Sequence, residues 1–353
     1  MHFFQSWQNE NCLLVPPILV RSGSWETLNS VEIRGLINDC LHSRASSTVA
    51  KYIREVRKFI NFQEINSRPL LFPADVAHLA SYLSTLLRKD SKTAVLSAYS
   101  ALKWIHGFIP VQFNPLDFTI CKNLVETEKR SPHPPVVKKE PVDLDMIKSI
   151  INNYASSDCN LKDLRFATMS TLLYVGLFRS QEQLDMKLCD LDVTDTYLEV
   201  RLPKSKTDIY RLGQTVFIPK SGLYTCPYSL LIRYLNMSKI HLNAKSDQFV
   251  FRNVVYHKSK GTYSLHRNRK VSYSRLRELF KESLTKLGYD QSLYGLHSFR
   301  SGGATSLAHT LENNPSKERL LKLHGRWKTD LAKDMYIKES VDQRLSFVKN
   351  LGL

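Results

Sequence analysis

The sequence predicts a mainly α-helical protein with one small antiparallel β-sheet, divided into two domains. Most of the chain has the spacing of amphipathic helices, in which apolar residues recur every three or four positions. Only the segments 197–202 and 215–218, and more weakly 249–251, have the pattern of short strands. A chain of 353 residues is also longer than one compact unit usually is, so two domains are expected.

The first domain is expected to be a helical bundle at residues 24–129, after an irregular lead at 1–23. Its clearest helix spans 47–62, where Val49, Ile53 and Val56 share one apolar face. Pro73 suits the first position of a later helix, and Gly107 suits a left-handed helix end. The other helices of this domain are expected at 25–41, 73–87, 91–106 and 116–128.

The helix at 47–62 has a basic outer face. Long cations are common on any solvated helix, and they also suit contact with the phosphates of a nucleic acid. The sequence leaves both interpretations open. The four residues concerned are Lys51, Arg54, Arg57 and Lys58.

A linker is expected at residues 130–143, because four prolines lie between Glu128 and Asp143. Residues 144–353 then form the second domain, which holds all three expected strands. Its helices are expected at 144–154, 161–174, 227–235, 273–287, 298–310, 316–323 and 331–338.

Composition points to a polyanionic partner. Fifty Lys and Arg residues against 33 Asp and Glu give a net charge of +17. Nucleic acid is the commonest such partner, although a ribosome-associated or membrane-surface protein would also be basic. The six cysteines lack metal-binding spacing, so we expect reduced thiols and no metal. We also expect no membrane span, no signal peptide in 13–20 and a setting inside the cell, in the nucleus of a eukaryote or in the cytoplasm or nucleoid of a bacterium.

Five short pieces of the second domain contain the candidate chemistry, in the order GLFRSQEQL, PKSKTD, GLHSFRSGGAT, HGRWKTD and KDMYIKES. Each piece alone is weak evidence for a catalytic site. An H-x-x-R pair usually lies on a helix surface, and a tyrosine near a C-terminus is usually half-buried by packing. Together, however, they supply the residue types that attack of a tyrosine on a phosphodiester requires. The residues are Arg179 and Glu182, Lys206, His297 and Arg300, His324 and Trp327, and Tyr336.

Residues 179–336 resemble the catalytic domain of the tyrosine recombinases, or lambda-type integrases, over essentially all of 144–353. Residues 24–129 resemble the SAM-like core-binding domain of that family by pattern alone, and the resemblance implies that the two domains clamp double-stranded DNA. It also implies a site-specific recombinase or integrase that needs no cofactor. The implied catalytic residues are Arg179, Lys206 on a hairpin, His297, Arg300, Trp327 and the nucleophile Tyr336, supported by Glu182.

The family usually has His where we place Trp327. We prefer Trp327 to His324 because it lies nine residues before Tyr336 (336 − 327), which is the usual spacing. The motifs HSFRSGGAT and HGRWKTD resemble those of the recombinases of DIRS-type retroelements and Cryptons. The lead SWQNENCLLVPP resembles the stretch that precedes the recombinase in DIRS-type polyproteins. This resemblance implies a mobile-element origin.

These residue types suit the reaction without a metal. Two guanidiniums, Arg179 and Arg300, stabilise the extra negative charge of a five-coordinate phosphorane. The phenol of Tyr336, with an ordinary pKa of roughly 10, needs a base, for which His297 is the candidate. By the resemblance Lys206 protonates the leaving 5′-oxygen, and the indole N–H of Trp327 donates a hydrogen bond to the phosphate.

The segment 339–350 has one apolar helix face, formed by Val341, Leu345 and Val348. This face could pack on its own subunit or dock on a neighbouring copy in a tetramer, as in the family. Three other functions remain open: a catalytically silent DNA-binding protein derived from a recombinase, a monomeric type IB topoisomerase, and a helical scaffold with a basic surface.

Overall fold

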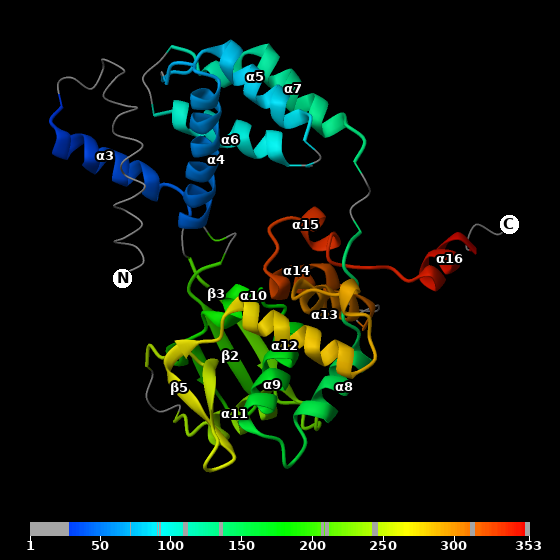
Figure 1. Ribbon diagram of the computed structural model, residues 1–353. Helices are drawn as coiled ribbons and strands as arrows, with labels where there is room; N and C mark the ends of the chain where they lie inside the picture. The colour runs from blue at the N-terminus through cyan, green and yellow to red at the C-terminus, as the bar shows by residue number, and fades with distance from the viewer. Residues whose placement is uncertain are drawn as a thin grey trace. The chain divides into compact units, whose positions relative to one another are not determined.

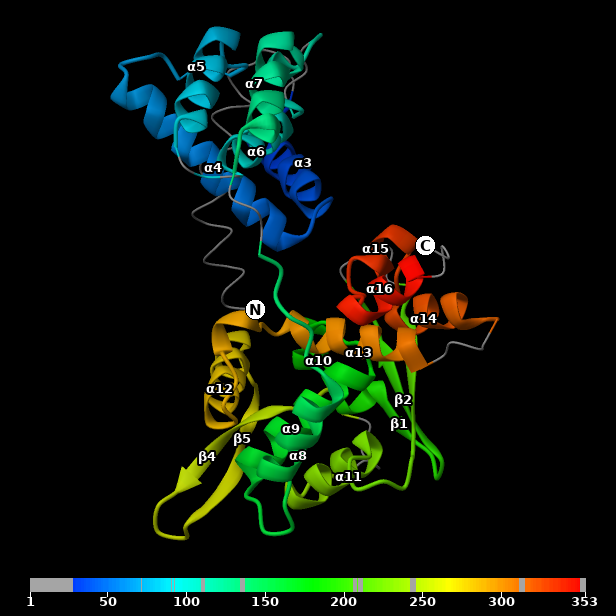
Figure 2. The same ribbon diagram turned by 90° about the vertical axis from the view of Figure 1, so that its right-hand side faces the viewer.

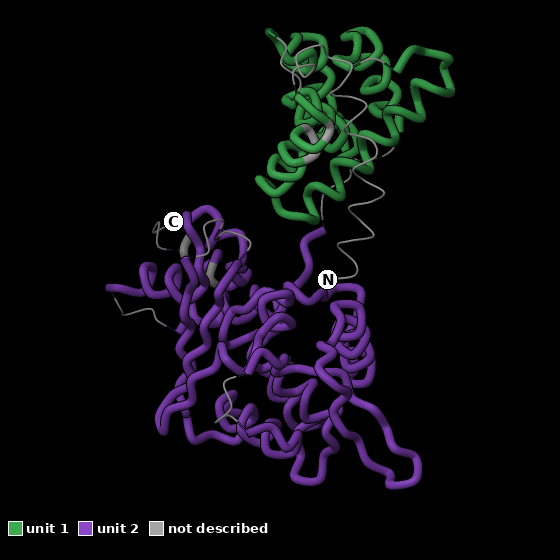
Figure 3. The backbone as a smooth tube through the Cα atoms, turned by 90° about the vertical axis from the view of Figure 1, so that its left-hand side faces the viewer, with its two compact units in different colours: residues 1–136 green, residues 137–353 purple. Residues whose placement is uncertain are grey.

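The computed structural model describes residues 28–70, 72–89, 91, 93–108, 112–133, 137–205, 208, 212–241, 246–310 and 315–349 (Figures 1 and 2). The chain divides into two compact units, Met1–Val136 and Val137–Leu353 (Figure 3). Each unit has its own hydrophobic core. Among the described residues, none of the helices combines the length and apolarity that crossing a bilayer would need.

Unit 1 is a helical bundle built around the buried face of α4. On that face Val56 and Phe59 are almost fully buried, and α6 packs along the helix. His106, at the end of α6, is also fully buried: its Nε2 accepts from the backbone N–H of Ala74 at 3.0 Å, and its Nδ1 donates to the carbonyl of Leu102 at 2.7 Å. The elements are α3 (Ser30–His42), α4 (Ser46–Ile65), α5 (Val76–Leu87), α6 (Ala94–His106), the 3-10 turn η1 (Pro115–Asp117) and α7 (Thr119–Arg130).

Two details predicted for this unit are wrong. Pro73 does not begin a helix, because α5 starts only after Asp75, whose carboxylate caps the helix by accepting from the backbone N–H of Ala77 at 2.7 Å. Gly107 ends α6 in a right-handed conformation, with φ −68°, and not in the expected left-handed one. The helix expected at 25–41 begins at Ser30, after its cap Asn29, and residues 25–27 lie outside the described part.

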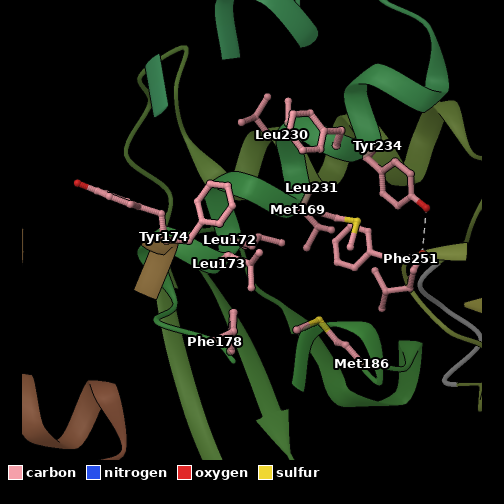
Figure 4. Close-up of a cluster of buried hydrophobic side chains, with 14 of the residues drawn as sticks. Met169, Leu172, Leu173, Tyr174, Phe178, Met186, Leu230, Leu231, Tyr234 and Phe251 are labelled. Atoms are coloured by element: carbon pink, nitrogen blue, oxygen red, sulfur yellow. Dashed lines mark hydrogen bonds between the residues drawn. The ribbon is translucent and has the colours of Figure 1, made fainter. Parts of the chain in front are cut away.

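Unit 2 is organised around α9, which is buried on almost every side. The side chains of Met169, Leu172 and Leu173 belong to one buried cluster with Leu231 of α11 and with Phe251 (Figure 4). Helices α8, α11 and α13 contact α9 directly. The helices are α8 (Leu144–Tyr154), α9 (Leu161–Val175), α10 (Ser180–Leu184), α11 (Pro227–Met237), α12 (Tyr273–Lys286), α13 (His297–Thr310), α14 (Lys317–Gly325), α15 (Asp330–Asp334) and α16 (Val341–Lys349), with 3-10 turns η2 (Leu188–Asp190) and η3 (Gln291–Leu293).

Two antiparallel sheets accompany these helices. In the first, β1 (Leu191–Val193), β2 (Tyr197–Leu202) and β3 (Gln214–Pro219) lie in that order, and the register pairs buried Val200 with buried Val216. The second is a hairpin of β4 (Arg252–His257) and β5 (Thr262–Lys270). The fold class, mainly α with small antiparallel strands, is therefore confirmed.

The expected strand at 249–251 is wrong. Phe249 makes only an isolated bridge to Lys187, and the extended chain begins at Arg252. The hairpin itself was not predicted, because its residues do not alternate cleanly between apolar and polar. Its register is irregular between Arg252 and Val254, and most of its side chains are exposed.

Candidate active site

The turn after α14 brings Trp327 back against the helix. Arg326 has a left-handed backbone, with φ 59° and ψ 39°, and this conformation reverses the chain. The indole of Trp327 then lies directly over Gly325, where an added Cβ would meet the ring at 1.8 Å. Trp327 is only 7% exposed, and its ring lies 5.3 Å from that of Tyr336, centroid to centroid.

Tyr336 lies just beyond α15 and is tied to α13 through its backbone. Its carbonyl accepts from the hydroxyl of Ser301 at 2.6 Å, and the hydroxyl of Thr305 accepts from the backbone N–H of Lys338 at 3.1 Å. Because these hydrogen bonds occupy the carbonyl of Tyr336 and the N–H of Lys338, α15 ends at Asp334. The helix expected at 331–338 is therefore wrong in its second half. The phenol ring is half-buried.

Arg300 lies beneath both aromatic rings and is fully buried. Its guanidinium carbon is 4.7 Å from the centre of the Trp327 ring and 5.1 Å from that of Tyr336. Two of its nitrogens donate to the carbonyls of Leu177 and Gly325. Burial, together with the nearby charges of Arg326 and Arg179, lowers the pKa of Arg300 to about 10, so it stays charged at neutral pH.

Glu182 joins Arg179 to Arg326. One carboxylate oxygen accepts from Arg179 Nη1 at 2.6 Å, and the other accepts from Arg326 Nη2 at 2.9 Å. Burial alone would raise the pKa of Glu182, but the charge of Arg326, the backbone N–H of Arg179 and the charge of Arg179 lower it below its ordinary value. The carboxylate therefore stays ionised and fixes both guanidiniums.

Arg326 is the residue that sequence reasoning missed. The motif HGRWKTD offers this arginine, but no role was predicted for it. In the structure it is 4% exposed and donates to the carbonyls of Gly176 at 3.0 Å and Leu177 at 2.7 Å as well as to Glu182. Neither its left-handed backbone nor its burial has a signal in a single sequence.

His324 has a different surrounding from the other candidates. Its Nε2 donates to the carbonyl of Val175 at 2.7 Å, and burial lowers its pKa below the ordinary value. It is therefore a neutral link between α14 and the end of α9. The aromatic ring that lies against Tyr336 is that of Trp327.

The remaining predicted residues are exposed or lie outside the described chain. His297 is exposed as the first residue of α13, three positions before buried Arg300. Lys206 lies outside the described residues. In unit 1, four cations are exposed on α4, one of which pairs with Glu55 at 2.9 Å; they are Lys51, Arg54, Arg57 and Lys58.

The site is suited to an anion. Within the described residues, the buried Nε1 of Trp327 and Nε of Arg300 have no hydrogen-bond partner. Three guanidiniums face one carboxylate here, so the cluster has excess positive charge. Among the same residues, no group of His, Cys, Asp and Glu is placed to hold a metal ion.

Solved structures resemble this chain over both units. The crystal structure of XerH site-specific recombinase bound to difH substrate, as a pre-cleavage complex, has a TM-score of 0.56 at 15% identity, covering 84% of this chain and 79% of that one. Its post-cleavage complex on a palindromic difH substrate gives 0.57 at 13% identity, covering 87% and 78%. The fold is that of the tyrosine recombinases.

A lambda integrase dimer bound to a COC′ core site shares this tyrosine-recombinase fold, with a TM-score of 0.51 at 16% identity, covering 84% of this chain and 90% of that one. No family model and no curated protein matches the chain. Sequence identities this low establish the fold alone. The resemblance to DIRS-type and Crypton recombinases stays a prediction.

Proposed function

We propose that this chain is a DNA recombinase that cleaves and rejoins double-stranded DNA through a covalent bond between Tyr336 and a 3′-phosphate. One observation supports this most: the Tyr336 ring lies 5.1 Å from the buried guanidinium of Arg300, in a cluster where positive charge exceeds negative. A cation beside the phenol favours the phenolate form that attack on phosphorus requires.

The chemistry follows from the side chains. The phenolic oxygen of Tyr336 attacks phosphorus, a new P–O bond forms, and the bond to the 5′-oxygen breaks. Arg300 and Arg179 stabilise the charge that develops on the non-bridging oxygens, and they do so more strongly out of water. The phosphotyrosyl bond conserves the energy of the broken phosphodiester, so a 5′-hydroxyl of another strand can reverse the step.

Proton transfer is assigned from the family resemblance. His297 accepts the proton of Tyr336, and Lys206 gives a proton to the leaving 5′-oxygen. Trp327 cannot exchange a proton near neutral pH, but its partnerless N–H can donate to a phosphate oxygen. Because Arg300 is fully buried under two rings, we expect the Tyr336 ring to shift when a phosphate enters.

Assembly and origin are further parts of the proposal. On α16, Val341, Leu345 and Val348 are 72%, 54% and 57% exposed, which disfavours packing on their own subunit and favours docking on a neighbouring copy in a tetramer. The α4 cations would contact DNA phosphates. A mobile-element origin is supported only by the sequences of the motifs, and the location follows the host: the nucleus in a eukaryote, the cytoplasm or nucleoid in a bacterium.

Covalent capture tests the proposed reaction. A library of nicked duplexes with randomised sequence should yield DNA attached to the protein, because the cut fragment diffuses away and prevents religation. Tyr336→Phe should abolish attachment and leave duplex binding intact, since only the nucleophilic oxygen is lost. Attachment that persists in Tyr336→Phe would refute the assignment, and binding without attachment in the wild type would favour the catalytically silent alternative.

A type IB topoisomerase would also attach covalently. Relaxation of supercoiled DNA by monomers, with no assembly on two DNA sites, would favour that enzyme. Strand exchange that depends on protein assembly would favour a recombinase. Mass measurement of the protein on DNA, combined with a relaxation assay, separates the two.

A further inference from the structure

The β4–β5 hairpin has a concentration of positive charge that the proposed reaction does not use. Its residues include six Lys or Arg, and no Asp or Glu occurs anywhere from 251 to 277. Lys270 pairs with Asp185 and Arg252 is half-buried, which leaves four exposed side chains. These four, called the hairpin cations below, are Lys258, Lys260, Arg267 and Arg269.

The hairpin cations lack carboxylate partners, unlike several other cations of unit 2. Lys148 pairs with Asp145 at 3.1 Å, and Arg275 pairs with Glu278 at 3.1 Å. For the hairpin cations, no carboxylate within the described ranges comes within ion-pair distance. Uncompensated cations on one element repel each other, so their concentration is a cost unless an anionic partner offsets it.

The hairpin is held as a stiff ribbon. The rings of Tyr256 and Tyr263 face each other across the strands at 4.9 Å, and the hydroxyl of Ser264 lies 2.7 Å from His257 Nε2. At the base, Arg165 of α9 donates to the carbonyl of Arg252. A ribbon fixed in this way loses little conformational entropy on binding.

Two of the hairpin cations lie in the irregular part of β5. The register pairs Val254 with Leu265 and Arg252 with Lys270, so the residues of β5 between these pairs do not follow simple alternation. Here Arg267 and Arg269 flank Asn268, whose side-chain oxygen accepts from the backbone N–H of Phe249 at 2.9 Å. Both arginines are exposed.

The ribbon extends away from the candidate active site. In both views, α13, α14 and α15 lie at one end of unit 2, and the β4–β5 turn lies at the opposite end (Figures 1 and 2). The hairpin cations therefore lie away from the DNA segment that Arg300 and Tyr336 would bind. A two-stranded ribbon also has the width that the major groove of duplex DNA accepts.

We propose that the β4–β5 hairpin is a second contact surface for duplex DNA, in which the hairpin cations bind backbone phosphates. The inference rests on the proposed function only in taking DNA as the polyanion. The bound duplex is a flanking or second segment, separate from the phosphodiester at Tyr336. Contacts of this kind add affinity in a salt-dependent way and do not read sequence.

The test removes the hairpin cations by changing all four to Gln. The matched control variant carries Lys148→Gln, Lys187→Gln, Arg201→Gln and Arg275→Gln, which removes the same residue types and the same net charge from cations that pair with carboxylates. Binding is measured in the Tyr336→Phe background, so strand cleavage does not contribute. The probe is a fluorescent duplex of about three helical turns, roughly 30 base pairs, followed by anisotropy.

The hairpin variant should lose about four units of the slope of log affinity against log salt, one for each phosphate contact. Its affinity at low salt should fall by at least about tenfold, and that of the control variant should fall much less. Equal losses in both variants would show a general effect of net charge and overturn the inference. Unchanged binding of the hairpin variant would also overturn the inference. The cations would then serve only to keep the strand edges from pairing with another chain.

Two further outcomes separate this inference from the proposed function. If the wild type binds duplex through the hairpin but never attaches covalently to DNA, the proposed reaction fails and the inference stands. If vesicles containing phosphatidylserine bind the hairpin cations as tightly as duplex does, DNA is the wrong partner and the inference fails. Circular dichroism melting of both variants checks that the fold is kept.

Discussion

At the scale of single residues, the three arginines near Glu182 have different roles in the candidate site. Arg326 has both terminal nitrogens bound to protein oxygens, so it has no donors left for a phosphate except its Nε. Arg300 instead lies under the rings of Trp327 and Tyr336. Arg326 is therefore a positioning residue, which holds Glu182 and through it Arg179.

Arg326→Gln should reduce the free energy of unfolding by about 3–5 kcal/mol, because it leaves a buried carboxylate without its partner. The two side chains of this pair are 1% and 5% exposed, so solvent does little to replace the contact. Arg275→Gln, which breaks an exposed pair with Glu278, should cost no more than about 1 kcal/mol. Urea unfolding of both variants measures this, and equal losses would contradict the role of Arg326.

Arg326→Lys separates positioning from stability. A lysine keeps the charge but cannot reach Glu182 and two carbonyls at once, since it lacks the planar fork. Duplex binding should be retained, and the rate of covalent attachment should fall by at least about tenfold, in the manner of a mispositioned catalytic group. Attachment at the wild-type rate would show that Arg326 has only a structural role.

At the scale of elements, the sequence predicted best where a cap and an amphipathic face agree. Both ends of α8 were predicted correctly, and the structure shows Asp143 capping it by accepting from the backbone N–H of Met146 at 2.7 Å. The α15 helix was predicted too long, since its end is set by contacts of Tyr336 with α13, far away in sequence. The β4–β5 hairpin was missed because its charged residues mask the alternation of a strand.

The candidate site, too, was predicted only in part from the sequence. Spacing and family resemblance were enough to select Arg179, Arg300, Trp327 and Tyr336, which the fold brings together. They could not reveal that Arg326 is buried or that Arg300 is covered by two rings, because both depend on a left-handed residue and on packing between α9 and α14.

The packing of α13 depends on two glycines of GLHSFRSGGAT, Gly302 against the segment before α8 and Gly303 against α9. A Cβ at Gly302 would lie 1.8 Å from the carbonyl oxygen of Val142, and one at Gly303 would lie 2.0 Å from that of Tyr174. Gly302→Ala should therefore lower stability by at least about 1–3 kcal/mol, because backbone must move. Gly35→Ala is the control: no atom lies within 4 Å of its added Cβ, so it should stabilise α3 by about 0.5–1 kcal/mol. Thermal melting measures both changes, and a neutral Gly302→Ala would contradict this packing.

At the scale of the whole molecule, each of the two units contains a histidine that burial keeps neutral. His106 joins α6 to the turn before α5 in unit 1, and His324 joins α14 to α9 in unit 2. Burial lowers the pKa of both below the ordinary value, that of His106 to about 4. Because folding excludes the protonated form, both units are expected to lose stability in mild acid.

The sign and size can be worked out for His106. Its pKa is about 6.5 in the unfolded chain and about 4 in the folded one, so the unfolded state binds more protons between these values and stability falls as pH drops through this window. From pH 7 to pH 5 this group should remove about 2 kcal/mol from the free energy of unfolding of unit 1. His106→Gln keeps an acceptor for Ala74 and a donor for Leu102 but does not titrate, so its loss over the same range should be smaller by that amount. Hydrogen exchange of the α6 amides, which reports on unit 1 within the full chain, measures both; an equal pH dependence in the two proteins would show that His106 is not the group responsible.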